Sequence, residues 1–294
     1  MDIIVDEAQY WAHSEASIYR RADSFHDALR VVGTTQDENK LLLRCPPIGF
    51  RDYEKVGLAF KTAPLPPKSG DGSPVTEPLR NLTLLEPTSS PTEVVSEAPR
   101  EYFTGSMDQP PMLTHPVRKI VFKIRSKDQG WGSTVGDRDS YRGSWSWFEV
   151  GLEKFDKDRT CDGSCKTSAP AGNSENATTS GTTSEGDEST LCTCGLQSIF
   201  PPVEQTPRGH LAYHHSLHPL DNLKILNNRT AHKEFMDHEV ADRLVEIGRG
   251  RSTGTGKFIH SLKLGDVITV WGKARFGGWA NVVESVKVEI YWAA

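Results

Sequence analysis

The sequence predicts a mainly β protein built around one antiparallel β-sandwich, and three observations predict it. Residues 117–152 and residues 258–292 are both rich in alternating apolar positions and in tryptophan. Both regions also contain glycine turns, as expected for short strands joined by tight loops. A long polar stretch separates them, which indicates that one sandwich, spanning residues 115–294, is interrupted by an insertion.

The chain ahead of the sandwich divides into two parts by composition. Residues 1–61 form an N-terminal segment. Within residues 7–32 of it, apolar residues recur in steps of three and four, so we expect an amphipathic helix there. That helix either docks on its own domain or binds a partner. Residues 62–114 are rich in Pro, Ser, Thr and Glu, so they bury too little apolar area to fold and are expected to form a disordered linker.

Local alternation predicts the strands of the sandwich. Residues 117–125 alternate between apolar and charged side chains, which is typical of a half-buried strand. Residues 144–152 carry apolar side chains on both faces, so this strand is either covered on both sides or lines a cleft. Residues 258–264 and 267–273 are expected to be two strands joined by a glycine turn, and residues 286–292 a final strand.

A polar and repetitive stretch lies inside the sandwich region. Residues 154–193 contain the run NSENATTSGTTSEGDEST, which is of low complexity. Such a composition cannot offset its ordering entropy by burying apolar surface. We therefore expect a disordered insertion on the surface of the sandwich.

Four blocks of sequence, taken in order, resemble a known family. They are SKDQGW, YRGSWSWFEVGLE, NRTAHKEFMDHEV and the stretch from residue 258 to residue 292. Together they are similar to a domain found in many filamentous-fungal proteins of unassigned activity, which has the pattern of a jelly-roll sandwich of the galactose-binding-like type. The resemblance covers roughly residues 115–294 without the insertion and implies an antiparallel jelly-roll β-sandwich. It brings no catalytic residues to this chain.

Aromatic and polar residues gather at the predicted loop ends of the sandwich. Loops cluster at the two ends of such a fold, and binding sites are usually found there. An exposed indole offers a flat apolar face to a sugar ring, while Asp, Asn, Gln and Arg supply directional hydrogen bonds. The candidate ligand-binding residues are Asp128, Gln129, Trp131, Trp147, Arg275, Trp279 and Asn281. The alternative is that the tryptophans close the ends of the core and that the Asp-Gln-Gly run is ordinary turn chemistry.

Four cysteines at the two necks of the insertion form the candidate metal site. The thiolates of Cys161, Cys165, Cys192 and Cys194 could bind Zn²⁺ and close the loop. The alternatives are a redox-labile pair and free thiols, because the Cys-x-Cys spacing strains chelation by both sulfurs. The nearby histidines could join Cys192 and Cys194 in a mixed metal site or simply be solvated; they are His210, His214, His215 and His218.

Composition and charge exclude several classes of function. The net charge of -5 and the pI near 6.1 argue against a general nucleic-acid-binding protein. No apolar run reaches the length of about 18 residues that a transmembrane helix needs, so no membrane partner is expected. The first residues lack the basic start and apolar core of a secretory signal, so we expect a cytoplasmic or nuclear protein.

Known catalytic templates are missing from the sequence. It contains no Gly-x-Ser-x-Gly elbow, no phosphate-binding loop and no His-Glu-x-x-His motif. We therefore predict a non-catalytic module that binds a carbohydrate or a polar peptide through its loop-end aromatic residues without a cofactor. The alternative is an interaction or scaffold protein, in which the N-terminal helix holds a partner and the sandwich is purely structural. An enzyme is the least favoured of the three classes.

Overall fold

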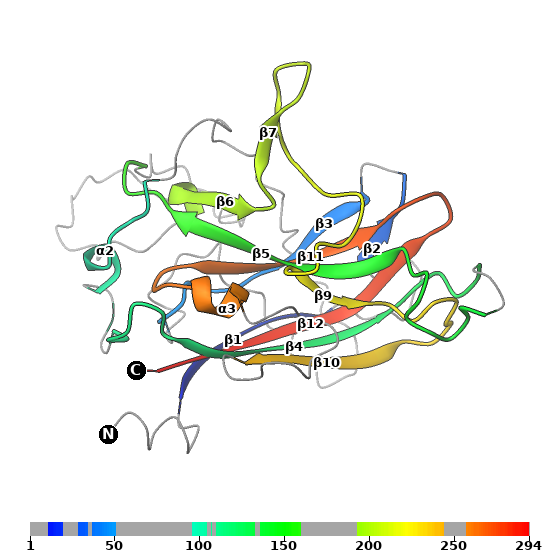
Figure 1. Cartoon of the computed structure of the whole chain (residues 1–294), viewed down its shortest axis with the longest axis horizontal. Coiled ribbons are helices and arrows are strands. Elements are labelled where there is room, and N and C mark those ends of the chain that lie inside the picture. Colours follow the sequence, from blue (N-terminus) through cyan, green and yellow to red (C-terminus); the bar gives the residue numbers. More distant parts are fainter. Residues whose placement is uncertain are drawn as a thin grey trace, which may run out of the picture.

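Two antiparallel sheets lie face to face in the computed structural model of the chain, the arrangement of a β-sandwich (Figure 1). The structure describes residues 11–19, 29–34, 37–50, 96–104, 107, 110–132, 136–159, 193–243 and 257–293. The first sheet contains β1 (Ala12–Tyr19), β2 (Leu29–Val32), β4 (Val117–Lys127), β10 (Met236–Arg243) and β12 (Ala280–Trp292). The second contains β3 (Asn39–Arg44), β5 (Ser146–Phe155), β6 (Leu196–Phe200), β9 (Lys224–Asn227) and β11 (Val267–Ala274).

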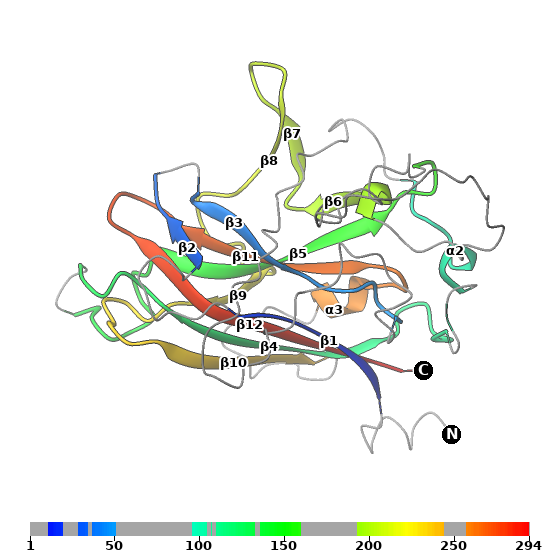
Figure 2. The same ribbon diagram turned by 180° about the vertical axis from the view of Figure 1, so that it is seen from behind.

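The remaining elements are short. Strands β7 (Val203–Gln205) and β8 (Leu211–Tyr213) form a separate hairpin, which projects away from both sheets in two opposite views (Figures 1 and 2). The helices are α2 (Glu101–Thr104) and α3 (Lys257–Ser261), and the 3-10 turn η4 covers Thr193–Gly195. No helix in the described part of the chain is long and apolar enough to cross a membrane.

Strand β12 is the centre of the first sheet. Its 13 residues pair with β4 on one side, and on the other side with β1 and then with β2. The sheet continues from β4 to β10, which gives the order β1-β12-β4-β10. In the second sheet, β11 lies between β3 and β5, and both β6 and β9 pair with β5 along different parts of its length.

The core lies between the two sheets and follows the predicted alternation. The inward-facing residues include Ile120, Phe122 and Ile124 from β4, Phe148, Val150 and Leu152 from β5, Ile268 and Val270 from β11, and Val286, Val288 and Ile290 from β12. The four strands predicted around residues 117–125, 144–152, 267–273 and 286–292 are therefore confirmed. Because Trp147 and Glu149 on the other face of β5 are also buried, this strand is covered on both faces.

The helix predicted over residues 7–32 is wrong for the residues that the structure describes. Residues 12–19 form β1, in which Ala12, Ser14 and Ala16 are buried and the residues between them are exposed. This period of two fits a strand, and the pairing of β1 with β12 supplies the backbone hydrogen bonds that an isolated helix would have made internally. Since β1, β2 and β3 complete the two sheets, the sandwich begins well before residue 115.

The strand predicted over residues 258–264 is also wrong, because the chain forms α3 there. Ile259 and Leu262 are fully buried and lie three residues apart, so one helical turn places both on the core side. The predicted turn that follows is present. Gly265 has a φ of 83°, and Asp266 accepts a hydrogen bond from the backbone N–H of Lys263 at 2.8 Å.

The last part of the predicted linker packs on the sandwich. Phe103 of α2 is buried against Phe155, with ring centroids 5.5 Å apart, and Ala98 donates a backbone hydrogen bond to Phe155. Glu97 accepts hydrogen bonds from Lys154 and Lys263. Residues 62–95 of the predicted linker and residues 160–192 of the predicted insertion lie outside the described residues.

A matched pair of substitutions in β1 tests the strand assignment. Ala16→Asp places a carboxylate in the core and should lower the free energy of unfolding by about 3 kcal/mol or more. Ser17→Asp lies on the exposed face opposite Lys287 and should change it by less than about 0.5 kcal/mol. Urea denaturation of both variants measures the difference, and equal effects would contradict the strand.

Candidate functional site

The loops at one end of the sandwich are held together by Asp128. Its carboxylate accepts a hydrogen bond from the backbone N–H of Gly130 at 2.7 Å and another from that of Ala231. Asp128 is buried, and this burial raises the pKa of the carboxyl group although the N–H groups oppose the shift. The side chain therefore joins two loops and is not exposed to a ligand.

Gln129 fixes the position of the exposed Trp131. The Gln129 side chain accepts a hydrogen bond from the backbone N–H of Ala280 at 3.1 Å and donates one to the carbonyl of Trp131 at 2.7 Å. The Trp131 indole lies over Gly278, where a Cβ atom would come within 2.9 Å of the ring. Trp131 is nevertheless 61% exposed, so the loop presents a rigid indole to solvent.

A second group of side chains includes Phe276, from the same turn as Gly278: Trp145, Leu217, His218 and Phe276. Together with Trp131 we call them the aromatic patch. Phe276 packs edge-to-face on Trp145 with centroids 4.6 Å apart, and Trp145 lies 5.4 Å from His218. Phe276 is 43% and Leu217 52% exposed. The backbone of Phe276 has a φ of 62°, a strained conformation for a non-glycine residue that is often found at functional sites.

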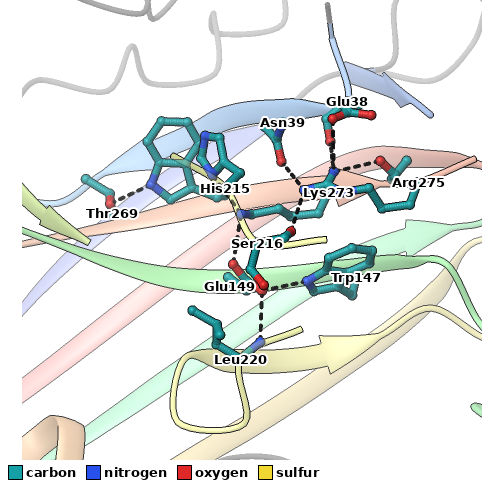
Figure 3. A network of polar contacts seen from close by, with 12 residues as sticks. Glu38, Asn39, Trp147, Glu149, His215, Ser216, Leu220, Thr269, Lys273 and Arg275 are labelled. Carbon is teal, nitrogen blue, oxygen red and sulfur yellow. Dashed lines mark hydrogen bonds and ion pairs between the residues drawn. The ribbon is translucent and has the colours of Figure 1, made fainter. Parts of the chain in front are cut away.

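Arg275 and Trp147, two of the predicted ligand-binding residues, are buried and lie in one network of polar contacts (Figure 3). The Arg275 guanidinium stacks 5.1 Å from the Trp147 ring and donates hydrogen bonds to the carbonyls of Glu38 and Ser216 and to the side chain of Asn39. Burial lowers the pKa of Arg275. Arg275 therefore holds two loops against the outer face of the second sheet and does not meet a ligand.

Asn281, another predicted ligand-binding residue, links the two sheets. Its Nδ2 donates to the carbonyl of Trp147 at 3.0 Å, and its Oδ1 accepts from Nδ2 of Asn228 at 2.9 Å. The side chain is fully buried. Of the seven predicted residues, Trp131 is exposed, Gln129 and Trp279 are half-buried, and the other four are buried.

The sequence interpretation missed three apolar residues of the patch. Phe276 follows Arg275 directly and precedes a Gly-Gly pair, and an aromatic residue beside a glycine turn was the available signal. Trp145 shares its side of β5 with Trp147 in the sequence pattern, so only the three-dimensional structure separates the half-buried indole from the buried one. Leu217 and its neighbour His218 lie in a loop with no periodic pattern.

The same polar network holds residues 214–220, which we call the strap, through His215, Ser216 and Leu220 (Figure 3). Lys273 lies 2.9 Å from Glu149 Oε2 and 2.8 Å from Nδ1 of His215. The other oxygen of Glu149 accepts hydrogen bonds from Nε1 of Trp147 and from the backbone N–H of Leu220. The strap is thus fastened to the sheet by directional polar bonds.

The network fixes the protonation state of His215. Burial, together with the nearby cations Lys273 and Arg275, lowers the pKa of His215 to about 2. Burial also lowers the pKa of Lys273, against the attraction of Glu149. A neutral His215 accepts the hydrogen bond from the Lys273 ammonium group at Nδ1, so its proton resides on Nε2.

A second buried ion pair lies on the same face of the second sheet. Arg44 donates two hydrogen bonds to Glu153, from Nε at 2.6 Å and from Nη2 at 2.8 Å. Tyr213 of β8 lies near this pair, and burial raises the pKa of its hydroxyl group to about 12. Tyr213 and His215 both pack on Trp271, with centroids 5.4 and 4.9 Å away.

The predicted metal site falls largely outside the described residues. Cys161, Cys165 and Cys192 are not among them, and only the backbone of Cys194 is described. Three of the predicted histidines make other contacts: His214 pairs with Glu204, His215 with Lys273, and His218 packs on Trp145. Within the described ranges, no group of three or more His, Cys, Asp or Glu side chains is placed to hold a metal ion.

Comparison of the chain with protein-family models, curated proteins and solved structures finds no significant match. The resemblance to fungal galactose-binding-like domains therefore stays a prediction. The loop end of the β-sandwich carries three exposed large apolar side chains, Trp131, Leu217 and Phe276.

His215 should make the stability of the protein depend on pH. Its pKa is about 2 in the folded state against 6.5 in the unfolded chain, so the unfolded state binds one more proton between these values. The contribution is therefore full above pH 6.5 and falls by about 1.4 kcal/mol for each unit below it.

The variant His215→Gln keeps an acceptor for Lys273 and should lose this pH dependence, whereas His214→Gln should keep it. Denaturant unfolding between pH 4 and 8 measures the slopes. Asp266, whose pKa burial raises to about 6, contributes equally to all three proteins and cancels in the comparison. Identical curves for the wild type and His215→Gln would contradict the assignment.

The Lys273–Glu149 pair should behave as one unit. Lys273→Met leaves a buried carboxylate without its cation and should cost about 3–5 kcal/mol of stability. Adding Glu149→Gln removes that charge while keeping an acceptor for Trp147, so the double variant should be more stable than Lys273→Met. Additive losses in a urea double-mutant cycle would show that the pair is not coupled.

Proposed function

We propose that this chain is a non-catalytic carbohydrate-binding module whose ligand stacks on Trp131 in the aromatic patch. The observation that carries this proposal is an indole, 61% exposed, on a loop fixed by Asp128 and Gln129. An exposed large aromatic side chain does not gain the free energy that burial of its apolar surface would give. A ligand that stacks on the indole would supply that burial. A rigid loop reduces the entropy that a ligand must overcome on binding.

The charges around Trp131 favour a neutral ligand. The exposed charged side chains on the adjoining loops include the cations Arg138, Arg142 and Lys233 and the anions Asp139 and Glu234. Both signs are present with a small excess of cations, so the surface offers hydrogen-bonding groups without a strong field of one sign. A neutral sugar, with apolar ring faces and many hydroxyl groups, fits this combination better than a charged peptide.

We infer further that the sandwich is a jelly roll. The first sheet has the order β1-β12-β4-β10, and the second has the order β3-β11-β5-β6 with β9 also paired to β5. These orders support the inference because the chain crosses between the sheets at most of its connections. Loop-end binding sites are common on such folds. The fold type alone does not determine function, so the proposal rests on the patch.

The scaffold alternative has lost its main support. It required an amphipathic helix over residues 7–32, and residues 12–19 form β1 within the first sheet. No observation in the described part of the chain now favours it over a binding module.

Trp131→Ala should weaken glycan binding at least tenfold while the unfolding transition stays unchanged, because the exposed indole contributes little to the core. Phe276→Ala should weaken it less. The control is Tyr102→Ala, an exposed aromatic residue on α2 at the opposite end of the molecule (Figure 1). A neutral-glycan array identifies the ligand, and calorimetry measures affinity. Binding of peptides and not glycans through Trp131, or binding unaffected by Trp131→Ala, would overturn the proposal.

A further inference from the structure

One edge of the first sheet is open along β1. Among the described residues, β1 pairs only with β12, and the antiparallel register runs without a shift from Ala12 to Tyr19. In an antiparallel strand, alternate residues direct their backbone N–H and C=O groups to opposite sides. Half of the backbone groups of β1 therefore face away from β12, toward a position that another strand could take.

This edge lacks the features by which β proteins usually protect an open strand. Such features are Lys or Pro in the strand, a β-bulge, or a very short strand. β1 is 8 residues long and contains no Lys, Arg or Pro. Its pairing with β12 contains no bulge. The edge is therefore suited to pairing with another strand.

Ser14 indicates that a polar partner is missing on this open side. Its side chain faces the inside of the sandwich, is only 4% exposed, and its Oγ has no hydrogen-bond partner in the described part of the chain. Buried hydroxyl groups are nearly always hydrogen-bonded. The neighbours of Ser14 on the same face, Ala12 and Ala16, are apolar, and so is Ile290, which lies opposite it on β12. The open side is the direction from which a partner could reach this hydroxyl group.

A second copy of β1 provides that partner if the two strands lie antiparallel about a two-fold axis at Ser14. The two Ser14 side chains then face each other, and each hydroxyl group can donate to or accept from the other. On the exposed face, His13 of each copy lies opposite Glu15 of the other, so an imidazole N–H can donate to a carboxylate. On the buried face, Ala12 lies opposite Ala16, and these small side chains allow close packing.

Neighbouring registers of the same two strands fit less well. An axis at Glu15 would place two glutamates opposite each other, where like charges repel. It would also place Ser14 opposite Ala16, and an axis at His13 would place Ser14 opposite Ala12. A register shifted by half a step would bring inward-facing side chains opposite outward-facing ones. Of these registers, only the axis at Ser14 gives its hydroxyl group a polar partner.

We propose that this protein forms a two-fold symmetric dimer in which β1 pairs with β1 of a second copy. The pairing joins the two first sheets into one continuous sheet. Because the axis reverses the strand direction, the loop ends that carry Trp131 point in opposite directions. The interface is therefore separate from the aromatic patch and does not depend on a ligand there.

Cysteine substitutions in the full chain test the dimer and its register together. In Ser14→Cys, the two Cα atoms at this position lie about 4.5–5.5 Å apart, a distance that a disulfide spans. A mild oxidant should therefore cross-link the two copies, and mass spectrometry should find the disulfide in the peptide that contains position 14. The matched control is Ala16→Cys, also on the buried face. Its two thiols are separated by roughly 13 Å along the strands and should not cross-link.

Sedimentation measures the dimer without cross-linking. The wild type should show twice the 32.6 kDa mass of one chain. His13→Glu places a carboxylate opposite Glu15, and symmetry repeats this repulsion, so the dimer should weaken about tenfold or more. Glu15→Lys should also weaken it. A mixture of these two variants should associate again, because the new carboxylate then faces the new ammonium group. Trp131→Ala should leave the mass unchanged.

Four results would overturn the proposal. The first is a wild-type chain that sediments as a monomer at every concentration at which it stays soluble. The second is a dimer in which Ser14→Cys forms no cross-link, and the third is one in which Ala16→Cys cross-links equally well. The fourth is loss of the dimer in Trp131→Ala, which would place the interface at the aromatic patch. Loss of glycan binding by Trp131→Ala with the dimer intact would leave this proposal standing.

Discussion

The pairing of β12 with three other strands is the constraint on which the rest of the structure depends. β4 lies on one side of it, and β1 and β2 share the other side. The turn that enters β12 carries Phe276 and Gly278, and the first residues of β12 receive the Gln129 side chain and supply Asn281. The position of the exposed Trp131 is thus set by the same strand that organises the first sheet.

The outer face of the second sheet carries buried charged side chains that position the strap. Buried ion pairs add little net stability, because desolvation offsets their attraction, but their geometry is specific. Lys273 and Arg275 each hold the strap at a defined atom, His215 Nδ1 and the Ser216 carbonyl respectively. Leu217 and His218 directly follow His215 and Ser216 in the chain. The hydrogen bonds to His215 and Ser216 therefore determine where this part of the patch lies.

The strands with strong local alternation could be predicted from the sequence, and those defined by distant partners could not. β4, β11 and β12 alternate large apolar residues with polar or small ones, so their burial follows from their own sequence. β1 buries the small residues Ala12, Ser14 and Ala16 against a strand more than 260 positions away, and nothing local signals that pairing. In the candidate site, too, some features could be predicted from the local sequence and others depend on distant contacts. Both Trp131 and Trp147 are predicted at loop ends, and the exposed position of the one and the burial of the other, against which Arg275 stacks, are visible only in the structure.

The central place of β12 also determines when the first sheet can form during synthesis. β1, β2 and β4 have all been made by residue 127, yet the strand that joins them begins at residue 280. At about 5–20 residues per second, this interval lasts roughly eight to thirty seconds on the ribosome. Throughout it β4 lacks β12, and until residue 243 has been made it lacks β10 as well, while β1 and β2 have no neighbour in their sheet. Unpaired strand edges are therefore exposed to other chains. The lysines and arginines that alternate along β4 place charge on such an edge, which is a means by which β proteins oppose association before folding is complete.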